Sequence, residues 1–135
     1  MSSSISQTME QTAAHASALS KKESAQMRDI VLSALEDAKG EQVSVLDVQK
    51  MTDITDYMIV ATGTSDRHVQ TLADRVMEFM RDAGWSHIGV EGEEVKDWIL
   101  VDFVDVIVHV MRAATREQYD LEGLWDQTFG ELITE

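Results

Sequence analysis

The segment WILVDFVDVIVHVM, residues 98–111, decides the fold of this chain. It contains two runs of strand-forming residues, Trp98 to Phe103 and Val106 to Met111, with only Val104 and Asp105 between them. This spacing predicts an antiparallel hairpin with a two-residue loop. The predicted register pairs Phe103 with Val106, Val101 with Val108, and Ile99 with Val110.

The two faces of this hairpin differ, because side chains alternate along a strand. One face is entirely apolar and is expected to lie in the core; its residues are Ile99, Val101, Phe103, Val106, Val108 and Val110. The second face is mixed, and only part of it can be comfortably buried; its residues are Trp98, Leu100, Asp102, Ile107, His109 and Met111. On this second face, Asp102 and His109 form a diagonal pair that is placed to hydrogen bond.

Upstream of the hairpin, apolar residues at helical spacing predict a helix that begins near Ser24 and ends at Gly40. A short strand is predicted over Val43 to Val48. The continuous apolar run from Tyr57 to Thr62 predicts a strand that is covered on both faces.

A second helix is predicted to begin at Ser65, whose side chain can cap it, and to end at Gly84. The segment from His87 to Val90 is the expected returning strand, so strand, helix and strand suggest some parallel pairing. A short final helix is predicted over residues 115–125, weakened by Gly123. The chain is therefore expected to be an α/β protein with a mixed sheet of about five strands and helices packed on it.

The length of 135 residues is that of one domain, which we place at residues 25–126. Residues 1–24 are rich in Ser, Thr, Ala and Gln, and are expected to form a disordered tail. Residues 127–135 are expected to be frayed. The tail has neither the apolar region of a secretory signal nor the arginines of a mitochondrial presequence, and the expected location is cytoplasmic. The chain contains no cysteine, which excludes disulfides and thiol chemistry.

The charge is strongly acidic, with 25 Asp and Glu against 11 Lys and Arg and a net charge of −14. Such a surface repels phosphate backbones and anionic membranes, so direct binding to nucleic acid or to a membrane is disfavoured. A basic protein partner is favoured. The alternative interpretation is that the acidity only keeps the protein soluble.

Catalytic and metal-binding patterns are weak in this sequence. The four histidines do not have metal-ligand spacing, and Ser65 does not stand in a nucleophile motif. Residues 91–105 hold six acids against Lys96, and these residues form either a solvated rim or a docking surface anchored by Trp98. Trp98 can instead simply cover the core. We therefore predict no catalytic, cofactor-binding or metal-binding residue.

The stretch from Ile30 to Trp125 resembles the ribosomal silencing factor family, also called Iojap-like, through a series of motifs in the same order. These motifs are Leu46-Asp47-Val48, Ile54-Thr55-Asp56-Tyr57, Gly63-Thr64-Ser65-Asp66-Arg67-His68, Val90-Glu91-Gly92, Asp97-Trp98, Val108-His109-Val110 and Tyr119-Asp120-Leu121-Glu122-Gly123-Leu124-Trp125. The resemblance implies a nucleotidyltransferase-like fold without catalysis or cofactor. It also implies a translational repressor that binds ribosomal protein uL14 on the large ribosomal subunit and blocks joining of the small subunit.

The expected partner surface is the second hairpin face. Trp98 is assigned to it because the Asp97-Trp98 motif matches the family, and Leu100, Asp102, Ile107, His109 and Met111 follow from the alternation. Three carboxylates are expected to be offered to Lys or Arg of the partner, namely those of Asp97, Asp102 and Asp105.

Three alternatives stay open at this point. They are an enzyme on a nucleotidyltransferase-like scaffold, a large-subunit assembly factor, and a homodimer that uses the same hairpin face. An organelle origin also stays open. One departure from the family concerns the hairpin turn, which usually carries Gly before Asp but here carries Val104. A β-branched residue resists the positive φ of a two-residue turn, so either the loop is longer or its type differs.

Overall fold

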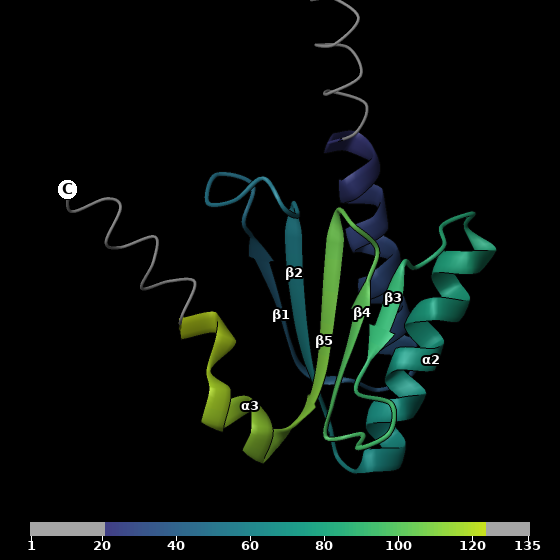
Figure 1. The fold of residues 1–135 in the computed structure, drawn as a ribbon. Coiled ribbons are helices and arrows are strands. Elements are labelled where there is room, and N and C mark those ends of the chain that lie inside the picture. Colours follow the sequence, from purple (N-terminus) through teal and green to yellow (C-terminus); the bar gives the residue numbers. More distant parts are fainter. Residues whose placement is uncertain (1–20, 124–135) are drawn as a thin grey trace, which may run out of the picture.

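A computed structural model describes residues 21–123, and its centre is a five-stranded sheet in the order β1-β2-β5-β4-β3 (Figure 1). The strands are β1 (Glu41–Asp47), β2 (Tyr57–Gly63), β3 (Gly89–Glu91), β4 (Trp98–Asp102) and β5 (Val106–Arg112). The helices are one over residues 21–37, α2 (Asp66–Asp82) and α3 (Ala113–Tyr119). Only β2 and β5 pair in parallel, so the sheet is mixed, as predicted.

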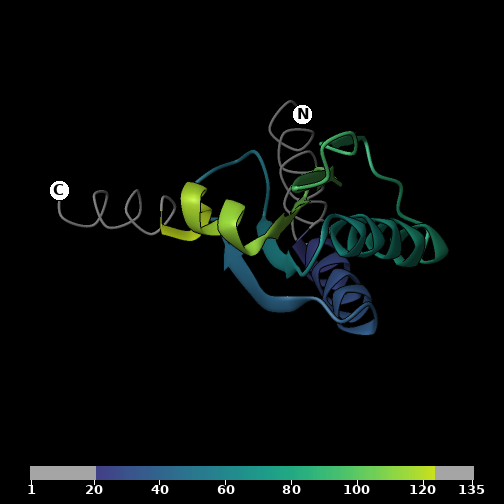
Figure 2. The same ribbon diagram turned by 90° about the horizontal axis from the view of Figure 1, so that it is seen from below.

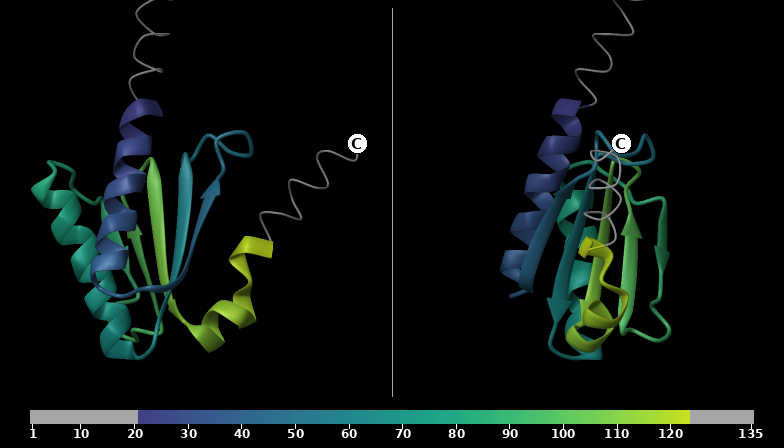
Figure 3. Two further views of the ribbon diagram at one scale, coloured as in Figure 1. Left: turned by 180° about the vertical axis from the view of Figure 1, so that it is seen from behind. Right: turned by 90° about the vertical axis from the view of Figure 1, so that its left-hand side faces the viewer.

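The main core lies between the sheet and two helices. The helix of residues 21–37 and α2 cover one face of the sheet, and α3 lies on the other side (Figures 2 and 3). Every residue of β2 is buried, which confirms that this apolar run is covered on both faces. None of the helices within residues 21–123 combines the length and the apolar character that are needed to cross a membrane.

The parallel pairing has a different partner from the one that the sequence suggested. We expected β2 to pair with the returning strand after α2, but β2 pairs with β5. The returning strand, β3, has three residues and pairs antiparallel with β4 at the edge of the sheet. The central position goes to β5 because its residues are largely apolar on both faces, whereas the short Gly-Val-Glu segment can bury little.

Three predicted helix boundaries differ from the structure. Residues 21–24 belong to the first helix and not to the tail, since Ser24 is fully buried and its hydroxyl donates to the carbonyl of Lys21. At the end of this helix, Lys39 adopts the left-handed conformation, with φ 61°, in place of Gly40. The final helix, predicted over 115–125, is interrupted at Asp120, which has φ 43°. The predicted tail up to residue 20 and the predicted frayed end lie outside the described residues.

The predicted start of α2 is confirmed. The backbone N–H of His68 donates to the Ser65 hydroxyl over 3.0 Å, which makes Ser65 the N-cap. Gly84 follows the end of α2 with φ 93°, a conformation that suits glycine.

The β4–β5 hairpin has the predicted register, with Ile99 opposite Val110 and Val101 opposite Val108. Its loop does consist of two residues, and Val104 adopts a positive φ of 73°. The turn is closed by the N–H of Asp105, which donates to the carbonyl of Phe103 over 3.0 Å. The Asp102 carboxylate accepts the N–H of Val104 over 2.8 Å. A β-branched residue in this region is strained, so the turn stores conformational energy.

Replacing Val104 with glycine is therefore expected to raise the free energy of unfolding by about 1 kcal/mol, because the strain removed exceeds the added backbone entropy. Val104 is half exposed, so little packing is lost. Val104→Ala is the matched variant, because it keeps a Cβ in the left-handed region and should gain less. Denaturant unfolding checks this prediction, and a Val104→Gly protein less stable than the native chain would contradict it.

Candidate functional site

The two faces of the hairpin have the environments that the alternation predicts. The inner face is buried throughout, from Ile99 on β4 to Val110 on β5. On the outer face, which lies opposite the helix of residues 21–37 and α2, four predicted site residues are partly accessible. We call this set, Trp98, Leu100, Asp102 and Ile107, the open hairpin face.

The remaining two outer-face residues are covered. Met111 is fully buried in a second apolar cluster with Met58 and Val60, and Leu121 from the segment after α3 packs on this cluster. His109 is only 6% exposed. Met111 therefore offers no surface to a partner, which corrects its place among the predicted partner-binding residues. The alternation of side chains placed Met111 on the correct face, but it could not show that the segment after α3 covers this residue.

Trp98 is held by two neighbours. Its indole N–H donates to Nδ1 of His109 over 3.0 Å, and its ring lies against Tyr119 of α3, with the ring centroids 4.9 Å apart. Burial lowers the pKa of His109 to about 4, so its imidazole stays neutral and accepts the indole proton. The predicted hydrogen bond between Asp102 and His109 is wrong, because His109 accepts from Trp98 and Asp102 accepts from the hairpin turn.

No residue of α3 is itself buried. A network of polar side chains attaches this helix to the sheet. Arg116 donates to the Glu122 carboxylate over 2.8 and 3.0 Å, and to the hydroxyls of Ser44 and Thr62. The Arg116 side chain is 12% exposed. Hydrogen bonds from Arg116 are the main reason that the pKa of Glu122 lies below its usual value. The network thus ties α3 and the following turn to β1 and β2.

The three predicted carboxylates lie at the two ends of the open hairpin face. Asp97 precedes β4, whereas Asp102 and Asp105 lie at the turn. The pKa of Asp105 is raised, first by burial and then by the nearby charges of Asp56 and Glu23. The turn end therefore carries concentrated negative charge, which favours a cationic neighbour.

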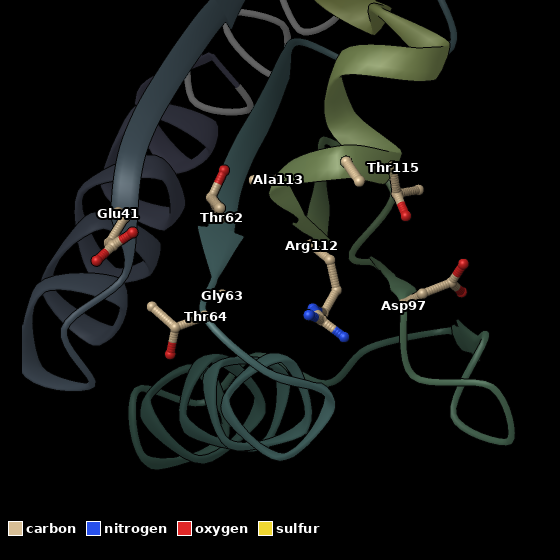
Figure 4. A pocket seen from close by; sticks show the side chains of 9 residues that line it. Glu41, Thr62, Gly63, Thr64, Asp97, Arg112, Ala113 and Thr115 are labelled. Carbon is tan, nitrogen blue, oxygen red and sulfur yellow. The ribbon is translucent and has the colours of Figure 1, made fainter.

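A separate cavity of about 550 Å³ lies where the parallel strands β2 and β5 end (Figure 4). Gly63 and Thr64 line it from β2 and the loop that follows, and Arg112 lines it from β5. Arg112 pairs with Asp66 over 3.1 Å, and the Asp97 carboxylate points away from its guanidinium group. The charged groups of this cavity have mixed sign and do not converge on one point.

Ser65 and His68 lie near this cavity, and both have structural partners. The Ser65 hydroxyl caps α2, and both ring nitrogens of His68 are engaged. His68 Nδ1 accepts the N–H of Thr64 over 2.9 Å, and Nε2 contacts the carbonyl of Ala38 over 2.9 Å. His68 thus joins the turn after the first helix to the start of α2. Within residues 21–123, no three His, Asp or Glu side chains gather to hold a metal ion.

The comparisons with known proteins decide the family. The family model described as "Ribosomal silencing factor during starvation" matches residues 21–134. The chain belongs to the ribosomal silencing factor family. A curated relative named Ribosomal silencing factor RsfS, from Chromobacterium violaceum, is 47% identical over 96 residues, which cover 71% of this chain and 79% of the relative. A second with the same name, from Haemophilus influenzae, is 40% identical over 97 residues, which cover 72% of this chain and 95% of the relative.

A solved structure supports the fold of this ribosomal silencing factor family member. The crystal structure of a Chromobacterium violaceum protein matches with a TM-score of 0.74 and 44% identity, and the match covers 76% of this chain and 85% of that one.

Two parts of the site were missed by sequence reasoning. Tyr119 and Leu121 complete the surroundings of Trp98 and Met111, although the predicted final helix over residues 115–125 assigned them no contact. Both stand in the last motif of the silencing factor resemblance, and this motif was the available signal. No pattern in the sequence around Arg116 indicated its hydrogen-bond network, because the partners of Arg116 on β1 and β2 are distant in sequence.

Proposed function

We propose that this protein binds ribosomal protein uL14 on the large ribosomal subunit and, by its bulk, prevents the small subunit from joining. It acts without catalytic turnover, as a translational repressor in the cytoplasm. The observation that carries the proposal is the open hairpin face, where Trp98, Leu100 and Ile107 are partly accessible between carboxylates at both ends.

The chemistry of this face suits a basic protein. Desolvation of its apolar side chains stabilises a complex, and the indole of Trp98 has the size and the fixed orientation of an interface anchor. Asp97 at one end and Asp102 and Asp105 at the other steer and orient a cationic partner. The net charge of −14 opposes contact with ribosomal RNA, so a ribosomal protein is the favoured target.

The names of the relatives point to the ribosome, and one of them favours a second candidate function. A mouse relative, 30% identical over 100 residues, is named "Mitochondrial assembly of ribosomal large subunit protein 1", and this chain covers 44% of its length. A role in assembly of the large subunit is therefore the alternative. Both functions require binding to that subunit and differ in whether joining is blocked.

Sucrose-gradient sedimentation separates these functions. Purified large subunits are incubated with the protein, and small subunits are then added. We expect the protein to sediment with the large subunit and the joined ribosome to fail to form. Binding without an effect on joining would favour the assembly role. The absence of binding at low salt, with active subunits of the same organism, would contradict both.

A further inference from the structure

Beside Trp98, the outer face of the hairpin contains a groove of about 360 Å³. Its apolar walls come from three separate elements: Leu100 on β4, Val95 in the loop before β4, and Tyr119 at the end of α3. Val95 is 68% exposed and Tyr119 is 52% exposed, so the groove is open to a partner. Of the open hairpin face, Trp98 and Leu100 line this groove.

The aromatic corner of this groove is fixed in place. The rings of Trp98 and Tyr119 meet at 49° with centroids 4.9 Å apart. The indole N–H of Trp98 is already bonded to His109, so Trp98 can offer a partner its ring and not its donor. A fixed aromatic surface of this kind attracts a cation through its π face.

The charge of the groove has one sign. Glu91 and Asp97 line it, and none of its other lining residues is charged. Glu91 lies opposite Leu100 in the β3–β4 register, which puts its side chain on the outer face. Among residues 21–123, neither carboxylate has a hydrogen bond or salt bridge to another side chain, whereas Glu93 on the same loop accepts from Gln70 of α2. Two acids are therefore available beside two aromatic rings.

We propose that this groove receives one arginine side chain of a basic protein partner. This inference rests on the proposed function for the identity of that partner, but not for the chemistry of the groove. The guanidinium group lies on the Trp98–Tyr119 corner, its edge donates to Glu91 and Asp97, and its aliphatic part packs on Val95 and Leu100. Arginine fits better than lysine, because a planar guanidinium group stacks on an aromatic ring and donates to a carboxylate at the same time.

The groove is tested first without any partner, by two-dimensional NMR of the full chain. N-acetyl-arginine amide is titrated while the indole N–H signal of Trp98 is followed, with Trp98→Phe to assign this signal. We expect saturation with a Kd of about 1 mM, which is typical of so small a ligand. The lysine analogue should bind about threefold more weakly, and the neutral citrulline analogue should not bind. Equal shifts with citrulline, or no shift with arginine, would overturn the proposal.

The groove is tested second in the complex with purified uL14. Glu91→Gln and Tyr119→Leu should each raise the Kd by about threefold to tenfold. Glu94→Gln is the matched control, since it removes an exposed acid of the same loop that does not line the groove, and its Kd should stay within about twofold of the native value.

The two tests keep the groove and the proposed function apart. If Trp98→Ala abolishes uL14 binding while Glu91→Gln and Tyr119→Leu bind as the native chain does, the arginine groove is overturned and the function stands. If the arginine amide saturates the Trp98 signal but the protein does not bind large subunits, the groove stands and the function is overturned.

Discussion

Replacing Trp98 with alanine is expected to weaken the binding of uL14 by about 2 kcal/mol or more, which raises the Kd roughly 30-fold. The reason is the position of the indole ring, which is partly accessible on the outer face and held by His109 and Tyr119. A large ring that is already ordered loses little entropy when a partner covers it. Isothermal titration calorimetry with purified uL14 measures the change.

Part of this effect can arise within the protein itself, because Trp98 also packs on the cluster of Met58, Val60 and Met111. Trp98→Phe separates the two contributions, since it keeps an aromatic ring but loses the bond to His109. Trp85→Ala is the control for loss of a tryptophan, because Trp85 packs against the main core on the other side of the sheet. A native Kd for Trp98→Ala, with native-like unfolding, would remove Trp98 from the interface.

Alternation along residues 98–111 was enough to predict the hairpin, its register and its two faces. The pattern is informative because every residue of the inner face is apolar, and a slip by one residue would bury Asp102. The apolar run of β2 predicted a strand covered on both faces for a similar reason, since no charged side chain in it marks a solvent side.

What covers each strand could not be predicted in the same way. Local patterns show that a strand exists, but they do not show which strand it pairs with. β2 pairs with β5 and not with β3, because β5 is longer and more deeply buried than β3, and this comparison involves the whole sheet. Met111 shows the same limit on the outer face. It is buried in a cluster with Met58 and Val60 on which Leu121 packs, and contacts so far apart in sequence leave no periodic trace.

The predicted side chains of the hairpin do lie on one face, but the bonds that they make were not predicted. Asp102 and His109 were correctly placed on one face, yet each has a closer partner, the Val104 N–H for Asp102 and the Trp98 indole for His109. The turn shows the opposite case. The sequence indicated that Val104 is unsuited to a positive φ. The loop nevertheless has two residues, and Val104 adopts a strained positive φ in it.

The free energy of unfolding is expected to fall by up to about 3 kcal/mol between pH 6.5 and pH 4 through His109 alone. In the folded protein, burial lowers the pKa of His109 to about 4 from its ordinary 6.5. The unfolded chain therefore takes up a proton in this range that the folded protein does not. The stabilising effect is complete above pH 6.5, is lost as the pH falls toward 4, and does not change further below that.

Denaturant unfolding from pH 7.5 to pH 4, for the native chain and His109→Asn, measures this effect. Asparagine has an acceptor oxygen near the position of Nδ1, so it can keep the bond from Trp98 while it removes the titration. Glu122 also has a lowered pKa, but both proteins contain it, so the difference between their curves isolates His109. His87→Asn removes an exposed imidazole and reports what the loss of any histidine does. If the native and His109→Asn curves remain parallel down to pH 4, His109 is not held neutral by burial, and the fixed orientation of Trp98 loses its electrostatic basis.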